Sequence, residues 1–295
     1  MAKISIIVLI FIMAMSCSAA EVPFTLEKGY IVISAKAKKD IPIEAAIFTG
    51  SSYSYFNENV LKRLHLQLGY TNDLPVTGAS SENALVFADI SGIVVGDEKP
   101  VEVKMRTQSF DSMVKAIGRN VDVILGVDYF DGKIVQFDFQ KRVIRFLDKP
   151  PVDYGSARSS TGPGTVRLMF KMDEHYQTFY GTMFTLPVAE EVFLNGAKLR
   201  TLFNTGVAFP VSISPFATKQ YSFGKVPDNN STARIQLKSI SLDGYEMADV
   251  PALLVGKGSG WAENENRYRA VVGIGLMQNF NVTFDWKNKM IVLER

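Results

Sequence analysis

Short apolar or alternating segments, rich in β-branched and aromatic residues, follow one another along most of the chain. Turn residues such as Gly96-Asp97, Gly132-Lys133 and Gln140-Lys141 interrupt them. This pattern predicts short strands joined by hairpins. In the first half of the chain these segments are Ile31–Ile33, Ala84–Ile90, Ile93–Val95, Val101–Met105, Val135–Phe139 and Val143–Phe146. We therefore expect a mostly β fold.

Two segments favour helices instead. In Asn57–Leu68 one face of a helix would carry Leu61, Leu64 and Leu68, and the opposite face would carry Lys62, Arg63 and His65. Asn57 can cap the first turn. A second short helix that matches this one is expected after Pro215.

The first twenty residues have the pattern of a secretory signal. Lys3 gives a positive start, Ile4–Met15 is apolar but too short to span a bilayer, and Ser18–Ala20 offers small residues for cleavage. We therefore expect residues 1–20 to be removed and the protein to be periplasmic or secreted.

The single cysteine of the chain, Cys17, lies inside this segment. The chain after residue 20 therefore has no disulfide, no cysteine nucleophile and no thiolate metal site. An alternative is that Ala14–Cys17 is a lipoprotein box, in which case a lipid on Cys17 would anchor the protein.

An internal repeat determines the predicted architecture. Gly126 aligns with Gly273 and Phe137–Phe139 aligns with Phe284–Trp286, all at an offset of 147 residues and without a gap. Repetition of this kind indicates duplicated structural units.

A second match lies earlier in each copy, where Ile47–Gly50 aligns with Phe203–Gly206 at an offset of 156 residues. Each copy thus has an apolar strand, then Thr-Gly, and much later two apolar residues and a glycine. We expect two homologous halves, at about 21–150 and 166–295, joined by a Pro/Gly/Ser-rich linker at 151–165.

Composition and charge exclude several classes of protein. The 295 residues are 47% hydrophobic and 21% charged, which is ordinary for a globular chain. A net charge of +2 gives no basic surface for nucleic acid. No segment after residue 20 is apolar enough to be a membrane helix.

The paired motifs resemble those of the retropepsin-like aspartic protease family, in particular the bacterial two-copy members related to pepsin. The resemblance covers nearly the whole chain after residue 20. It implies two acid-protease β-barrel halves in one chain, with one Asp-Thr-Gly loop from each half meeting at their interface. It also implies that a hairpin flap covers the cleft between the halves, and Thr77–Ser81 stands at the position of the first flap.

The chain departs from the family at the two residues that carry the chemistry. The first loop has Phe48 and the second has Asn204 where the family has Asp. Aspartic protease chemistry requires two carboxylates that share a proton. A phenyl ring does not titrate, and an amide does not accept a proton at useful pH. The resemblance therefore predicts a fold that lacks its catalytic dyad, and no residue of the chain is assigned a catalytic role.

The other loop residues are expected to build a binding site. Thr49 and Thr205 would hold the two loops together, and as nucleophiles they lack a base. Gly50 and Gly206 suit close backbone approach, as do Gly126 and Gly273. With Ser51, the residues Thr49, Gly50, Thr205 and Gly206 are the candidate binding residues.

Four aspartates near the repeated motifs are candidates for other roles. Asp138 and Asp285 recur in both halves, but each stands just before a hairpin turn, so we expect a structural role. Asp122 and Asp128 flank Gly126 without counterparts beside Gly273, and we expect them to be surface residues.

Metal and cofactor chemistry has no support in the sequence. His65 falls on the polar face of the predicted helix and His175 lies in a polar segment, so the two histidines form no ligand pattern. Two unrelated histidines, with no cysteine after residue 20, also do not support a Ser-His site. We expect no metal and no cofactor.

Three functions remain open. The chain is a catalytically inactive aspartic protease-like protein that binds a peptide or another extracytoplasmic ligand between its halves, a hydrolase that uses other residues, or a structural assembly subunit. Because both loops come from one chain, we expect a monomer.

Overall fold

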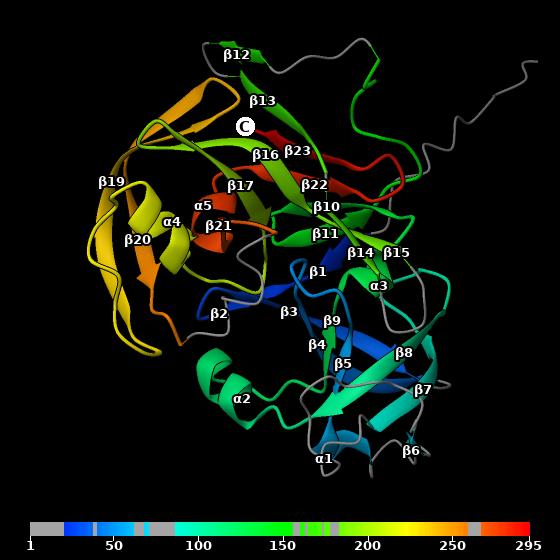
Figure 1. Ribbon diagram of the computed structural model, residues 1–295. Coiled ribbons are helices and arrows are strands. Elements are labelled where there is room, and N and C mark those ends of the chain that lie inside the picture. The colour runs from blue at the N-terminus through cyan, green and yellow to red at the C-terminus, as the bar shows by residue number, and fades with distance from the viewer. Residues whose placement is uncertain are drawn as a thin grey trace, which may run out of the picture.

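The computed structural model describes residues 21–37, 40–61, 68–70, 86–155, 160–162, 165–172, 174–177, 183–258 and 267–295. Strands dominate these ranges, and Figure 1 shows how they gather into sheets and a barrel, with short helices between and beside them. The predicted mostly β architecture is confirmed.

An eight-stranded sheet is built from the N-terminal part of the chain. Its strands, in spatial order, are β2 (Thr25–Glu27), β3 (Tyr30–Ala37), β4 (Ile41–Ile47), β9 (Val123–Leu125), β5 (Tyr55–Asn57), β8 (Val101–Gln108), β7 (Val86–Ile93) and β6 (Leu68–Tyr70). Strand β4 pairs in parallel with β9, so that Ile47 lies opposite Leu125. The loop that follows β4 therefore begins beside Gly126.

A closed barrel is built from the C-terminal part of the chain. Its strands, in spatial order, are β16 (Val188–Leu194), β17 (Ala197–Phe203), β21 (Ala270–Val272), β18 (Val211–Ile213), β20 (Tyr245–Val255) and β19 (Thr232–Leu242). Here β17 pairs in parallel with β21, so that Phe203 lies opposite Val272. The loop that follows β17 therefore begins beside Gly273.

The barrel and the eight-stranded sheet share one local topology. Strand β9 lies between β4, which is parallel to it, and β5, which is antiparallel. In the same way β21 lies between its parallel neighbour β17 and its antiparallel neighbour β18. The repeat in the sequence is thus accompanied by a repeat in strand pairing.

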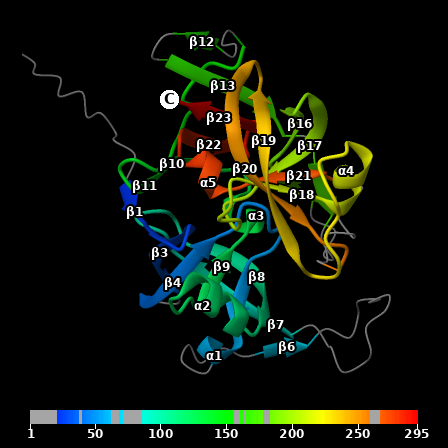
Figure 2. The ribbon, with the colours of Figure 1, turned by 90° about the vertical axis from the view of Figure 1, so that its left-hand side faces the viewer.

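A seven-stranded sheet joins the two parts, and Figure 2 shows it with the barrel above the eight-stranded sheet. In spatial order its strands are β1 (Glu21–Pro23), β11 (Val143–Phe146), β10 (Ile134–Asp138), β22 (Asn281–Asp285), β23 (Met290–Glu294), β13 (Thr165–Lys171) and β12 (Ser160–Gly162). The remaining strands, β14 (Glu174–Gln177) and β15 (Met183–Leu186), form a hairpin of their own.

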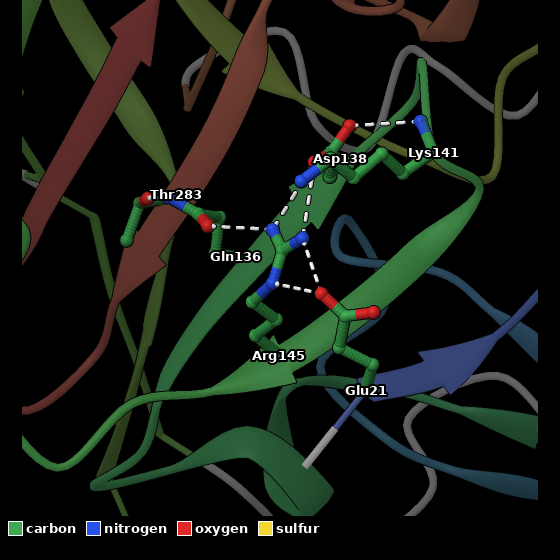
Figure 3. Close-up of polar contacts among 6 residues, drawn as sticks. All are labelled: Glu21, Gln136, Asp138, Lys141, Arg145 and Thr283. Atoms are coloured by element: carbon green, nitrogen blue, oxygen red, sulfur yellow. Dashed lines mark hydrogen bonds and ion pairs between the residues drawn. The ribbon is translucent and has the colours of Figure 1, made fainter. Parts of the chain in front are cut away.

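A pseudo-twofold axis passes through the centre of this sheet. Gln136 of β10 lies opposite Thr283 of β22, its own counterpart 147 residues away in the repeat. The Gln136 side chain donates a hydrogen bond to the Thr283 hydroxyl at 3.3 Å (Figure 3). A residue that faces its own counterpart lies on the axis that relates the copies.

Five short helices lie in the described ranges: α1 (Glu58–Leu61), α2 (Asp111–Ile117), α3 (Val127–Phe130), α4 (Pro215–Gln220) and α5 (Ile274–Met277). The helix predicted after Pro215 is confirmed as α4, whose first turn is capped by Ser214. The long helix predicted over Asn57–Leu68 is wrong at its end, because Leu68 belongs to β6 and pairs with Ala88 of β7. Its start is correct, since the Asn57 side chain accepts a hydrogen bond from the Asn59 backbone. None of these helices is long and apolar enough to cross a membrane.

The core packs large aromatic side chains between the sheets. The Trp286 ring stacks on Phe130 and on Phe284, each with ring centroids 5.3 Å apart, and its indole N–H donates to the carbonyl of Thr185. Such rings bury large apolar areas and dominate the energetics of a core. The Trp286 ring thus joins the N-terminal and C-terminal parts of the chain.

Candidate functional site

The loops that follow β4 and β17 meet through four reciprocal hydrogen bonds. The Thr49 N–H donates to the Thr205 hydroxyl at 3.1 Å, and the Thr205 N–H donates to the Thr49 hydroxyl at 3.0 Å. In turn the Thr49 hydroxyl donates to the carbonyl of Phe203 at 2.9 Å, and the Thr205 hydroxyl donates to that of Ile47 at 2.6 Å. The predicted contact between the two loops is confirmed, and both threonines are fully buried.

Each loop is also attached to the strand beside it. The backbone N–H of Phe48 donates to Leu125, and that of Asn204 donates to Val272, both at 2.9 Å. These two bonds are equivalent in the repeat and fix the first residue of each loop in the same backbone position.

The glycines after these strands allow the chain to approach itself closely. A Cβ atom at Gly126 would lie 2.3 Å from the carbonyl oxygen of Tyr53, and one at Gly273 would lie 2.2 Å from that of Phe209. Any side chain would displace the backbone there. The recurring glycines are therefore required by packing.

The side chain of Asn204 forms hydrogen bonds with the backbone of both loops. Its Oδ1 accepts hydrogen bonds from the Gly206 N–H at 2.7 Å and from the Gly50 N–H at 3.1 Å. Each loop thus gives one glycine N–H to the same amide oxygen. Since Phe48 offers no acceptor, Asn204 alone satisfies both donors.

Phe48 fills its side of the loop pair with a ring. The ring stacks on Tyr30 with centroids 6.0 Å apart and lies over Gly206, where an added Cβ would be 2.7 Å from it. Phe48 also packs against a small apolar cluster that includes Val32 and Ile124. Both Phe48 and Tyr30 are half-buried, so the two rings form an aromatic surface beside the Asn204 amide.

Ser51 is occupied within the first loop. Its hydroxyl donates to the carbonyl of Tyr53 at 2.7 Å, and its own carbonyl accepts from the Val127 N–H at 2.8 Å. These bonds support the loop from the side of α3.

Asp128 is half-buried, so it departs from the surface position that was expected. Its carboxylate accepts from the Ser54 hydroxyl at 2.6 Å, from the Ser54 N–H at 2.8 Å and from the Tyr129 N–H. Burial raises the pKa of Asp128 to about 6, although these hydrogen bonds act in the opposite direction. The Ser54 hydroxyl also accepts from the Gly126 N–H and is fully buried, so the pair braces the strand beside the first loop.

Asp122 also departs from the surface position that was expected. It is half-buried, and its carboxylate accepts a hydrogen bond from the Glu44 N–H at 2.9 Å. It therefore links β4 to the segment that leads into β9.

Asp138 and Asp285 have the structural role that was predicted, because each accepts the N–H of the residue three positions later. Asp138 accepts from Lys141 at 2.9 Å, and Asp285 accepts from Asn288 at 2.7 Å. Figure 3 shows the second oxygen of Asp138 bonded to Arg145, which also binds Glu21 and Gln136. The second oxygen of Asp285 accepts from the Tyr154 hydroxyl at 2.8 Å. Asp138 and Asp285 are both occupied by these contacts and do not form a substitute catalytic pair.

Several predicted features lie outside the described residues: the signal segment with Cys17, the flap at Thr77–Ser81 and His65. His175 lies on β14. The described residues contain no group of three or more residues that could hold a metal ion.

Sequence reasoning missed two components of the site. Tyr30 gave no signal because it lies 18 positions before Phe48 and only the fold of β3 on β4 brings the rings together. The Ser54 and Asp128 pair has no counterpart in the second copy, so the repeat did not identify it.

The chain is similar in structure to known aspartic proteases. The crystal structure of an aspartic proteinase from Irpex lacteus matches with a TM-score of 0.54 and 12% sequence identity, covering 94% of this chain and 97% of that one. A retropepsin-like aspartic protease from Rickettsia conorii matches with a TM-score of 0.32 and 16% identity, covering 46% of this chain and 97% of that one. No protein-family model and no curated protein matches the sequence. The first structure shows that the chain has an aspartic protease-like fold, as predicted.

Proposed function

We propose that this protein is a catalytically inactive aspartic protease-like protein that uses the surface at its paired loops to bind an extended peptide or another extracytoplasmic ligand. The observation that carries the proposal is the pair of residues at the loop positions, Phe48 and Asn204. They stand in a loop framework whose hydrogen bonds are otherwise complete.

The absence of catalysis follows from the chemistry of those two side chains. Proton transfer by a shared carboxylate pair requires two titratable groups in contact. Phe48 has none, and the Asn204 amide can donate or accept hydrogen bonds but does not exchange a proton near neutral pH. The carboxylates that recur in the two copies, Asp138 and Asp285, are bound to hairpin turns.

Ligand binding is supported by what the loops retain. The rings of Phe48 and Tyr30 offer a half-buried aromatic surface next to the Asn204 amide. An extended peptide binds such a surface by placing side chains on the apolar part and main-chain groups on the polar part. We further propose that the protein acts outside the cytoplasm, either free after signal removal or anchored at Cys17, and that it is a monomer.

A peptide-retention assay tests this function. The protein is incubated with a randomised octapeptide library, separated by size, and the retained peptides are identified by mass spectrometry. We expect intact peptides to be retained by the native protein and lost with Asn204→Ala or Phe48→Ala. Asn59→Ala is the matched control, because Asn59 is exposed on α1.

Two outcomes would overturn the proposal. Retention that is equal in the loop variants and the native protein would place binding elsewhere. Cleaved peptides whose formation requires Asn204 would show that the protein is an enzyme.

A further inference from the structure

The hydrogen bonds at Asn204 fix the orientation of its amide group. Backbone N–H groups only donate, so the side-chain atom that receives them from Gly50 and Gly206 is the oxygen. An amide oxygen has two lone pairs, and these two bonds use both. The nitrogen Nδ2 must therefore lie on the other branch of the amide, with two N–H donors.

This nitrogen is available at the surface of the loop pair. Asn204 is half-buried. Its Nδ2 makes no hydrogen bond among the described residues, yet it is not one of the buried atoms left without a partner, so it is in contact with solvent. Nδ2 lies against Gly50, where an added Cβ would be 2.4 Å from it. Within the part of the chain that the structure describes, Asn204 makes its side-chain hydrogen bonds only through Oδ1.

The side chains of Phe48, Thr49 and Thr205 offer Nδ2 no free acceptor in the part of the chain that the structure describes. Phe48 presents carbon atoms, and the hydroxyls of Thr49 and Thr205 are fully buried and bonded to the facing loop. Toward a ligand the Asn204 amide therefore offers N–H donors, because its oxygen is already bonded to Gly50 and Gly206. A pair of carboxylates at these two positions would instead accept hydrogen bonds from a ligand.

From this geometry we infer the ligand chemistry of the site, on the basis of the proposed function. The ligand is a peptide that gives a carbonyl oxygen to Asn204 Nδ2 and places an apolar side chain on the rings of Phe48 and Tyr30. A ligand with a hydroxyl at the same position is disfavoured, because its O–H is buried without an acceptor. Leaving one donor unsatisfied reduces affinity by roughly tenfold.

Two matched peptide pools test this inference. Both have the same randomised apolar flanks, and they differ only in a central ketomethylene or hydroxyethylene group, that is, a carbonyl or a hydroxyl. Binding is measured by competition against a fluorescent peptide taken from the retained library. We expect the native protein to prefer the ketomethylene pool by about tenfold.

The Asn204→Asp variant should reverse this preference, because a carboxylate oxygen in place of Nδ2 accepts the hydroxyl proton and repels the carbonyl. Asn59→Asp is the control for the added charge and should keep the native preference. The comparison of the two pools on the native protein remains decisive even if Asn204→Asp is unstable.

The outcomes separate this inference from the function on which it rests. Equal binding of the two pools by the native protein, or tighter binding of the hydroxyl pool, would overturn the carbonyl preference and leave peptide binding intact. If neither pool competes with the retained peptide, the loops are not its binding site and both proposals fail.

Discussion

Replacing Thr49 by Val removes two of the four hydrogen bonds that hold the loops together. Valine has nearly the same shape, so the change deletes the hydroxyl without opening a large space. It leaves the carbonyl of Phe203 and the N–H of Thr205 without their partners at a fully buried position. Each buried polar group left unsatisfied costs about 1–3 kcal/mol. We therefore expect the free energy of unfolding to fall by about 2–5 kcal/mol.

Because the hydrogen bonds of the two threonines are reciprocal, the same loss of stability is expected for the equivalent variant of Thr205. Thr205→Val removes the two equivalent bonds, to the Thr49 N–H and to the carbonyl of Ile47. The two variants should lose similar stability, since each deletes one buried donor and one buried acceptor contact.

Urea denaturation followed by tryptophan fluorescence provides the assay, with Thr232→Val as the control. Thr232 is exposed on β19, so this variant should change stability by no more than about 0.5 kcal/mol. If Thr49→Val is as stable as the control, the loop contacts do not hold the two parts together and the reasoning is refuted.

Three further perturbations test individual contacts. Burial raises the pKa of Asp128 to about 6 from 3.8, so its protonated form favours the folded state. The stability it contributes is fully present below pH 3.8 and is lost as the pH rises through 6; a carboxyl carbon NMR titration with a midpoint below about 4.5 would contradict this. Arg145→Met should cost about 3–5 kcal/mol in chemical denaturation because it leaves a buried carboxylate without its ion-pair partner. Arg119→Met, whose pairs with Glu27 and Glu44 are only half-buried, should cost about 1 kcal/mol or less, and equal losses would refute the difference. Gly206→Ala should cost about 1–3 kcal/mol because its methyl group would lie 2.7 Å from the phenyl ring of the first loop, while Gly155→Ala meets no such contact and should unfold at the native urea midpoint.

The sequence predicted the strands and the meeting of the loops well because both depend on local pattern and duplication. Alternating runs gave β10 and β11 nearly to the residue. The two offsets, 147 and 156 residues, separate residue pairs that hydrogen-bond in the structure, namely Gln136 with Thr283 and Thr49 with Thr205.

Other features were missed because tertiary contacts decide them. The leucine spacing that predicted a helix up to Leu68 was overridden by the pairing of β6 with β7. The surface position expected for Asp128 rested on the lack of a counterpart beside Gly273, but the Ser54 hydroxyl and two N–H groups bind the half-buried carboxylate. The stacking of Tyr30 on Phe48 depends on strand register, which no motif records.

The double reversion Phe48→Asp with Asn204→Asp tests most directly whether the fold retains protease geometry without its chemistry. Native and reverted proteins are incubated with casein and a peptide library between about pH 3 and pH 7, where a shared carboxylate pair titrates, and products are measured by mass spectrometry. We predict no cleavage by the native protein and acid-pH cleavage by the reverted one. Cleavage by the native protein that Asn204→Ala abolishes would contradict the account, as would a folded reverted protein without any activity.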